Sequence, residues 1–286
     1  VSLSVECGLM AALLGPNGSG KSTLLSMLAG SLRPTHGVFR IAGLDVWGSD
    51  SRRARRIIGY MSQSDPFYPQ LTGWENLSLH AAMHGVRLDK DYVAGLAERI
   101  GLSVGDLSRR VGSYSGGMRR KLSLIAALLH KPRVLLLDEP DSGLDPASRR
   151  MLVSLLRNLA SHGTTILYAT HIGDSAIAAD IVFFMSDGRV IASGAPEELI
   201  ERYVPWFVAV LEAKDTGGLV RALRELEWVV GVVERDGGVT VTVRGSSREL
   251  AQLTELAARY GLMSLTIRRP SLEDAFIEAT GKRLEG

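Results

Sequence analysis

The chain has 286 residues, enough for one large domain or for one medium-sized and one small domain. Hydrophobic residues make up 45% of it, which suffices for a core and is too low for a membrane protein, and no apolar run approaches the roughly 18–20 residues of a membrane-spanning helix. The net charge of +2 gives no argument for nucleic acid, and the single cysteine, Cys7, excludes an internal disulfide, which suits a reducing cytoplasm.

The first elements of the chain surround a glycine-rich stretch. Residues 1–7 alternate apolar with polar side chains and predict a half-buried strand, residues 10–14 predict a buried strand, and apolar positions from Leu24 onward predict a helix. Between the second strand and the helix, the sequence fits the phosphate-loop pattern. Its residues are Gly15, Pro16, Asn17, Gly18, Ser19, Gly20, Lys21, Ser22 and Thr23.

The chemistry of phosphate binding explains these residue types. Glycines let backbone N–H groups approach anionic oxygens closely, and a helix N-terminus adds its partial positive charge. Lys21 can reach the terminal phosphates, and the Ser22 hydroxyl can ligate Mg²⁺. A glycine-rich turn without a ligand would require the Lys-Ser pair and both flanks to be accidental, so we expect a nucleotide.

Three shorter segments follow the loop. The pattern predicts a strand over residues 37–41, a basic helix over residues 51–56 and a strand over residues 57–61. We interpret the arginines of the helix as a solvated face rather than a nucleic-acid patch. Gln63 comes directly after the last of these strands, and it gains meaning only from the motifs further along.

The middle of the chain is predicted to be helical. Residues 72–107 carry an apolar face, and Thr72 with Glu75 forms a capping-box pattern. The sequence Tyr114-Ser115-Gly116-Gly117-Met118 then precedes a helix predicted over residues 119–129. A Ser-Gly-Gly at a helix start is a second anion-binding arrangement, although it is weak alone because these residues are common in helix caps.

Two carboxylates end the next predicted strand, residues 133–138. Its consecutive apolar residues indicate burial on both faces, and ligands bind at the carboxyl edge of such parallel sheets. There Asp138 can hold Mg²⁺ through water, and Glu139 can orient or deprotonate an attacking water. A turn at residues 141–146 leads to a helix, then to a strand over residues 164–169. His171 lies past this strand, where a γ-phosphate contact is favoured over a purely structural role.

The rest of the chain carries no catalytic motif. A hairpin with Asp-Gly in its turn is predicted over residues 181–192. After residue 205 the pattern predicts the order β-α-β-β-α-β, a ferredoxin-like split unit, with one hairpin turning at Asp236-Gly237-Gly238. The expected elements are strands at 206–211, 228–234, 239–244 and 262–267 and helices at 218–226 and 247–260.

Taken in order, the motifs of residues 1 to 200 resemble those of an ABC transporter ATP-binding subunit. Residues 15–23 resemble its phosphate loop, Gln63 its Q-loop glutamine, and residues 114–118 its Leu-Ser-Gly-Gly-Gln signature. Residues 134–139 resemble the Walker B strand, Ser142 to Asp145 the D-loop and His171 the switch histidine. Tyr114 and Met118 depart from the signature, but Tyr-Ser-Gly-Gly-Met is similar to exporters of the daunorubicin-resistance type, and so is the tail around residues 270–281.

The resemblance implies a fold and a site. Residues 1–204 would form an α/β P-loop NTPase domain of the ABC ATPase type, with a helical subdomain at about 72–130, and residues 205–286 a small ferredoxin-like α+β accessory domain. ATP and Mg²⁺ would be the cofactors. The implied catalytic residues are Lys21, Gln63, Glu139 and His171, and the implied metal ligands are Ser22, Gln63 and Asp138.

The resemblance also implies partners. Two subunits, which we expect to be identical, would pair head to tail around two ATP molecules. Ser115, Gly116 and Gly117 of one chain would act on the ATP of the other, with Ser142 and Asp145 as the D-loop. ATP hydrolysis would power a separate integral membrane permease, docked near Gln63 and the loop 65–69, with this chain as a peripheral subunit on the cytoplasmic face of the membrane and multidrug export as its task.

Two other functions remain open at this point: a non-transport ABC ATPase, acting in DNA repair or on the ribosome, and a nucleotide-binding regulatory module without turnover. Against the first, no sustained heptads lie between Lys21 and Ser115, and only one set of motifs is present. Against the second, Lys21, Asp138, Glu139 and His171 are intact.

One family feature is absent from the start of the chain. Members carry an aromatic residue that stacks on adenine before the phosphate loop, whereas the first aromatic residue here is Phe39. We expect that an N-terminal strand is missing from this chain, and that ATP binding by the chain as given is weakened by about 1–3 kcal/mol.

Overall fold

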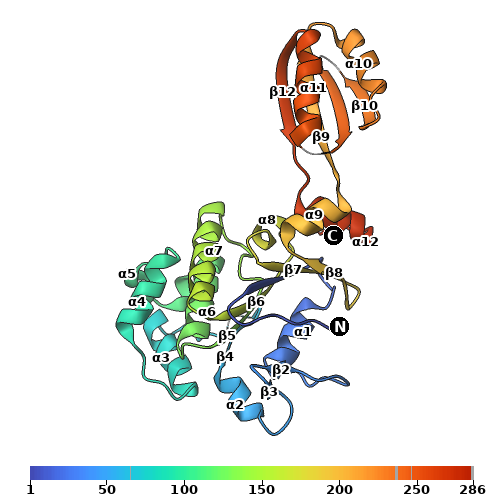
Figure 1. Ribbon diagram of the computed structural model, residues 1–286. Coiled ribbons are helices and arrows are strands. Elements are labelled where there is room, and N and C mark those ends of the chain that lie inside the picture. Colours follow the sequence, from blue (N-terminus) through green and yellow to red (C-terminus); the bar gives the residue numbers. More distant parts are fainter. Residues whose placement is uncertain (65, 236–237, 246, 285–286) are drawn as a thin grey trace. The chain divides into compact units, whose positions relative to one another are not determined.

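In the computed structural model, which describes residues 1–64, 66–235, 238–245 and 247–284, the chain forms two compact units (Figure 1). The larger unit contains Val1–Pro196 and the chain end from Arg283, and the smaller unit contains Glu197–Lys282. The expected boundary at 204/205 therefore lies too late. Helix α9 (Pro196–Tyr203) is grouped almost entirely with the small unit, and only two residues separate it from the first strand of that unit, so the sequence gives no break there.

A six-stranded sheet organises the larger unit. Its strand order is β4-β5-β6-β1-β7-β8, with β8 antiparallel and the other strands parallel. Helices cover both faces, α1 on one side and α6 and α7 on the other, so the parallel strands are apolar and largely buried, as predicted (Figure 1). The strands are β1 (Met10–Leu14), β4 (Ile58–Met61), β5 (Val134–Asp138), β6 (Thr165–Thr170), β7 (Ile181–Ser186) and β8 (Arg189–Gly194).

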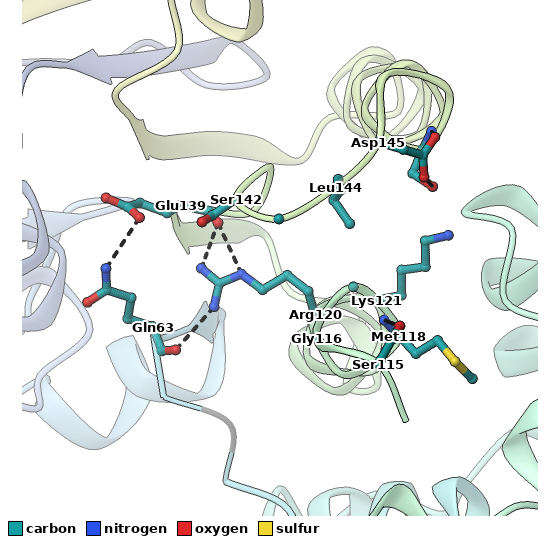
Figure 2. A pocket seen from close by; sticks show the side chains of 13 residues that line it. Gln63, Ser115, Gly116, Met118, Arg120, Lys121, Glu139, Ser142, Leu144 and Asp145 are labelled. Atoms are coloured by element: carbon teal, nitrogen blue, oxygen red, sulfur yellow. Dashed lines mark hydrogen bonds between the residues drawn. The ribbon is translucent and has the colours of Figure 1, made fainter. Parts of the chain in front are cut away.

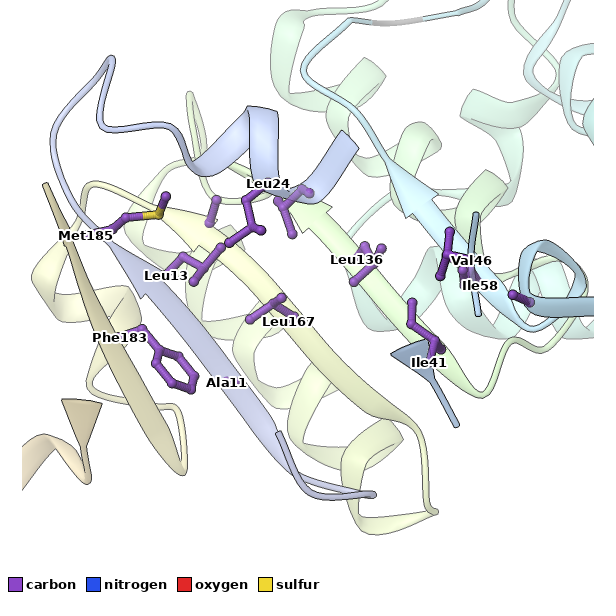
Figure 3. Close-up of a cluster of buried hydrophobic side chains, with 13 residues drawn as sticks. Ala11, Leu13, Leu24, Ile41, Val46, Ile58, Leu136, Leu167, Phe183 and Met185 are labelled. Carbon is purple, nitrogen blue, oxygen red and sulfur yellow. The ribbon is translucent and has the colours of Figure 1, made fainter. Parts of the chain in front are cut away.

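The core beneath α1 (Lys21–Leu28) joins residues from most of these strands (Figure 3). Leu24 and Leu25 of the helix pack on alternate residues of the sheet, because side chains of a strand point to opposite faces in turn. The remaining members of this cluster are Ala11, Leu13, Ile41, Val46, Ala54, Ile58, Leu136, Leu167, Ala169, Phe183 and Met185. This packing fixes where α1 starts, and therefore where the glycine-rich loop lies.

Two predicted strands are corrected by the structure. The strand predicted over residues 1–7 is wrong: Leu3 and Val5 pack against the core cluster, and this satisfies the apolar alternation without a partner strand among the described residues. The strand predicted over residues 37–41 is reduced to β2 (Arg40–Ile41), paired with β3 (Leu44–Asp45).

The helical pattern predicted over residues 72–107 is formed by three separate helices, α3 (Gly73–Met83), α4 (Lys90–Arg99) and α5 (Val104–Leu107). Gly85 and Gly101 end the first two helices with φ of 69° and 67°, a backbone that glycine adopts at helix ends. The capping box of Thr72 and Glu75 is confirmed. The larger unit also contains α2 (Ser51–Arg56), which precedes these helices, and α6 (Gly116–Leu128), α7 (Pro146–Ser161) and α8 (Gly173–Ala176), which follow them. A short 3-10 turn lies at Val111–Ser113.

The small unit is an antiparallel sheet with two helices on one face. The strand order is β10-β11-β9-β12, so β11 lies between the strands of a β-α-β unit, as in a split unit. Of the expected turn at 236–238, Asp236 and Gly237 lie outside the described residues. The elements are β9 (Trp206–Ala213), α10 (Thr216–Arg224), β10 (Val229–Arg235), β11 (Gly238–Arg244), α11 (Ser247–Arg259) and β12 (Leu262–Arg268), followed by α12 (Leu272–Thr280). Throughout the described parts of both units, helices fall short of the length and apolarity needed to cross a membrane.

Candidate functional site

Four parallel strands bring the predicted site residues to one edge of the large sheet. Leu14 of β1 is in register with Thr170 of β6, and Asp138 of β5 is in register with Ala169 of the same strand. On the other side of β5, Met61 of β4 is in register with Leu137. The residues that follow these strands therefore meet at one edge, although they come from distant parts of the sequence.

The phosphate loop lies between β1 and α1, as predicted, and it needs its glycines. A Cβ at Gly15 would lie 2.1 Å from the Met185 carbonyl oxygen, which is an impossible contact. Gly18 and Gly20 have φ of 79° and 97°, in the left-handed region. Ser22 and Thr23 lie in the first turn of α1. The loop is therefore a tight backbone cradle at a helix N-terminus.

Lys21 is buried inside this cradle. The residue is only 4% exposed, and its Nζ donates to the carbonyl oxygens of Gly15 at 2.6 Å and Pro16 at 2.9 Å. Burial lowers the pKa of this amine, while the carboxylates of Glu139 and Asp138 act in the opposite direction. The ammonium group is thus held among the loop residues and near two acids.

Two of the three residues expected to hold Mg²⁺, Ser22 and Asp138, are in direct contact. The Ser22 hydroxyl donates to Asp138 Oδ1 at 2.9 Å, and Asp138 is 2% exposed. Burial raises the pKa of the Asp138 carboxyl, and the bond from Ser22 opposes this. A hydroxyl and a carboxylate oxygen are hard ligands of the kind Mg²⁺ takes, so these residues fit the ion.

Glu139 meets two further predicted residues. Gln63 Nε2 donates to Glu139 Oε2 at 3.3 Å, and His171 Nδ1 lies 3.6 Å from Glu139 Oε1. Glu139 is 7% exposed and has φ of 50°, a left-handed backbone that costs a non-glycine residue about 1–2 kcal/mol. An acid with an unfavourable backbone at a strand end is typical of a functional position.

A cavity of about 570 Å³ lies in front of Glu139 and Gln63 (Figure 2). The signature segment and the D-loop line it from the other side. None of the residues 15–23 lines this cavity, although all of them belong to the described chain. The predicted site residues therefore fall into two groups. Residues 15–23 form the phosphate loop, whereas Gln63 and Glu139 line the cavity together with the signature segment and the D-loop. The remaining lining residues are Ser115, Gly116, Gly117, Met118, Arg120, Lys121, Ser142, Gly143, Leu144, Asp145 and Ser148.

The signature segment is ordered by its own side chains. Ser115 caps α6 by accepting the Met118 N–H at 3.2 Å, so α6 begins at Gly116, three residues before the predicted start. Tyr114 is 4% exposed and donates from its hydroxyl to the Asp106 carbonyl oxygen at 2.6 Å. A Cβ at Gly73 would lie 2.6 Å from the Tyr114 hydroxyl. The absence of a side chain at Gly73 therefore leaves the space that the Tyr114 hydroxyl occupies at the start of α3.

The two D-loop residues, Ser142 and Asp145, form hydrogen bonds with neighbouring residues of the same chain. The Ser142 N–H donates to the Glu139 carbonyl oxygen at 3.2 Å. Asp145 caps α7, where Oδ1 accepts the N–H groups of Ala147 at 2.9 Å and Ser148 at 3.0 Å, and Oδ2 accepts the Ser148 hydroxyl at 2.7 Å. The Ser148 hydroxyl is the main reason why the pKa of Asp145 falls to about 2.

Comparison with known proteins identifies the family. The family described as ABC transporter matches residues 1–142. The Nod factor export ATP-binding protein I of Rhizobium sp. (strain N33) is 36% identical over 288 residues, covering 100% of this chain and 92% of that protein. The chain belongs to the ABC transporter ATP-binding proteins.

A second relative and two solved structures agree. The daunorubicin/doxorubicin resistance ATP-binding protein DrrA of Streptomyces peucetius is 37% identical, covering 98% of this chain and 87% of that protein. An ATP-binding subunit of an ABC transporter has a TM-score of 0.64 at 30% identity over 71% of this chain and 85% of that chain. A dimeric ATP-binding cassette in a post-hydrolysis state with ADP and Pi has a TM-score of 0.63 at 26% identity over 68% and 88% of the two chains. The P-loop fold of the larger unit is thus that of an ABC ATPase.

Two features of this ABC ATPase were missed by sequence reasoning. Thr170 donates from its hydroxyl to the buried Asp141 at 2.8 Å and accepts the Ile172 N–H at 3.0 Å, which fixes the backbone around His171. Arg120 is 8% exposed and contacts the backbone at Glu139. A sequence signal for Arg120 existed, because it lies four residues before Leu124 on the apolar side of the helix.

Proposed function

We propose that this ABC ATPase is the ATP-hydrolysing motor of an exporter, with Glu139 as the general base. The contacts of the Glu139 carboxylate carry this proposal: its neighbours are Gln63, which follows β4, and His171, which follows β6, and these two strands flank β5. An enclosed carboxylate with an amide and an imidazole beside it can orient a water and accept its proton.

The other site residues receive complementary roles. Lys21 and the backbone N–H groups of residues 15–23 bind the phosphates, and His171 contacts the γ-phosphate. Ser22, Asp138 and Gln63 hold Mg²⁺, which, when bound, neutralises charge on the phosphate oxygens. The direct contact between Ser22 and Asp138 supports this assignment.

We assign the signature to a second copy of the chain. Ser115, Gly116 and Gly117 line a cavity that residues 15–23 do not line, so the start of α6 is available to the ATP of a head-to-tail partner. A similar solved cassette is described as dimeric. The intact motifs on both sides support a homodimer, with Ser142 and Asp145 of the D-loop at the same interface.

Export by a separate integral membrane permease is the transport role we propose. The names of two relatives refer to Nod factor export and to daunorubicin/doxorubicin resistance, and the matches span nearly the whole chain. The permease would dock near Gln63 and the loop up to residue 69, of which Asp65 lies outside the described residues. The subunit would then be peripheral, on the cytoplasmic face of the membrane.

The substitution Glu139→Gln tests the hydrolytic role. We expect ATP affinity to stay within about threefold and turnover to fall by about 10²- to 10⁴-fold, because the amide cannot accept a proton. An ATP-bound dimer should accumulate and be seen by size-exclusion chromatography with light scattering. The control is Glu98→Gln, an exposed residue of α4, which should turn over ATP normally. Normal turnover by the Glu139 variant would remove Glu139 as the base.

A further inference from the structure

Arg120 lies at the centre of the site, although no motif points to it (Figure 2). It comes from the second turn of α6 and is 8% exposed. Its guanidinium donates to backbone carbonyl oxygens of two separate segments. Nε and Nη2 bond the Glu139 oxygen at 3.0 and 2.6 Å, Nη2 also bonds the Asp138 oxygen, and Nη1 bonds the oxygens of Ser62 at 3.2 Å and Gln63 at 3.3 Å.

The two segments that Arg120 joins are the ends of β4 and β5. Ser62 and Gln63 follow β4, and Asp138 and Glu139 end β5, so all four acceptors lie at the sheet edge that carries the site. A guanidinium can bond both segments at once because its five donors form a rigid planar fork. Lysine places its donors on one nitrogen and has no such fork.

The bonds to Glu139 matter because its backbone is left-handed, with φ of 50°. This conformation persists only where the surroundings hold it. The Glu139 carbonyl oxygen accepts two bonds from Arg120 and one from the Ser142 N–H at 3.2 Å, and the Glu139 N–H donates to the Ala169 oxygen at 3.0 Å. Arg120 therefore supplies two of these four hydrogen bonds to the backbone groups of Glu139.

From this geometry we infer that Arg120 is a positioning residue for hydrolysis. It acts through Glu139 and Gln63: by fixing both backbones, it places the carboxylate against the amide of Gln63, 3.3 Å away, and beside His171. The inference rests on the proposed function of Glu139 as the base. The bonds of Arg120 described above end on the backbone of the segments that carry Gln63 and Glu139, so its loss should affect the chemical step more than ATP binding.

The first test is Arg120→Lys, which keeps the positive charge and removes the fork. We expect kcat to fall by about 10- to 100-fold while the KM for MgATP stays within about threefold, because a misplaced base slows the chemistry and leaves the phosphate contacts intact. Arg120→Gln is measured in parallel, so that a folding defect in one variant leaves the other to decide. The control is Arg99→Lys, in which an exposed arginine bonded to Asn158 at 2.8 Å is changed in the same way, and its kcat should not change.

The second test separates positioning from general damage to the fold. In single-turnover measurements, Glu139→Gln combined with Arg120→Lys should be no slower than Glu139→Gln alone, because Arg120 acts through the side chain already removed. Two results would overturn the inference: a folded Arg120→Lys variant with kcat within about twofold of the unchanged protein, or a double variant much slower than Glu139→Gln. Full turnover by Glu139→Gln alone would instead overturn the proposed function.

Discussion

The two units of the chain differ in what they bury. In its described part, the larger unit buries five charged residues, each no more than 8% exposed: Lys21, Arg120, Asp138, Glu139 and Asp141. In the described part of the small unit, no charged or polar side chain is buried, and the core of its sheet is made by residues such as Leu211, Leu219 and Val241.

This difference shows where the chemistry of the molecule is concentrated. A buried charge costs several kcal/mol unless it is paired and hydrogen-bonded, so a fold keeps such groups only where they are matched to one another. In the larger unit they are matched at one sheet edge, as the contact of Ser22 with Asp138 shows. The small unit needs no such network, and we expect it to contribute structure rather than catalysis.

The largest expected effect is on the stability of the small unit. Leu211 is fully buried in β9, and Leu211→Ala should destabilise this unit by about 2–5 kcal/mol through lost burial and a cavity. Hydrogen exchange of the β9 and β11 amides would measure it. The control is the adjacent Val210→Ala on the open face, where the residue is 42% exposed and the change should stay within about 0.5 kcal/mol. If ATP turnover fell together with the exchange protection, the small unit would take part in catalysis and the comparison would break.

The next effect concerns ATP binding by the larger unit. Lys21→Ala should weaken ATP binding by about 10- to 100-fold, because it removes the buried ammonium to which we assign the phosphate contact. Titration calorimetry would measure the affinity. The same change at the exposed Lys214 of the small unit is the matched control and should leave it unaltered. A Lys21 variant with normal ATP affinity would contradict the role assigned to this lysine.

The smallest expected effect is on the free energy of unfolding, when one tyrosine hydroxyl is removed from each unit in turn. Tyr114→Phe removes the bond to the Asp106 carbonyl oxygen and should cost about 1 kcal/mol in the free energy of unfolding, measured by denaturant titration. Tyr260→Phe in the small unit should change it by less than about 0.5 kcal/mol, since that hydroxyl has no hydrogen bond to the described residues. Equal losses in the two variants would show that the units do not differ in this respect.

Local patterns predicted much of this fold. The strand, glycine loop and helix around Lys21 required no knowledge of the rest of the chain, because the residue types themselves determine the backbone there. The hairpin turn at Asp187 and Gly188 has φ of 49° and 72°, as an Asp-Gly turn requires. The family resemblance supplied the order of the motifs, and the comparisons agree with it.

Contacts between distant segments escaped prediction for a physical reason. The spacing of Arg120 from Leu124 indicates that it lies on the buried side of its helix, but only the fold brings it to the carbonyl groups at Ser62 and Glu139. The helical pattern of residues 72–107 did not show where one helix ends and the next begins, because the apolar period continues on both sides of Gly85. Residues 1–7 show the opposite error, since alternation reports which side chains are buried and not whether a partner strand exists.

The left-handed backbone of Glu139 has a consequence for engineering and for evolutionary drift. Glycine relieves such a backbone at no steric cost, so replacing this glutamate relaxes the peptide while deleting the carboxylate. A selection for thermal resistance alone would therefore favour Glu139→Gly, a variant that lacks the proposed general base. Heat-resistant versions of this ATPase are better sought among surface residues of α4 or α11, with turnover scored in every round.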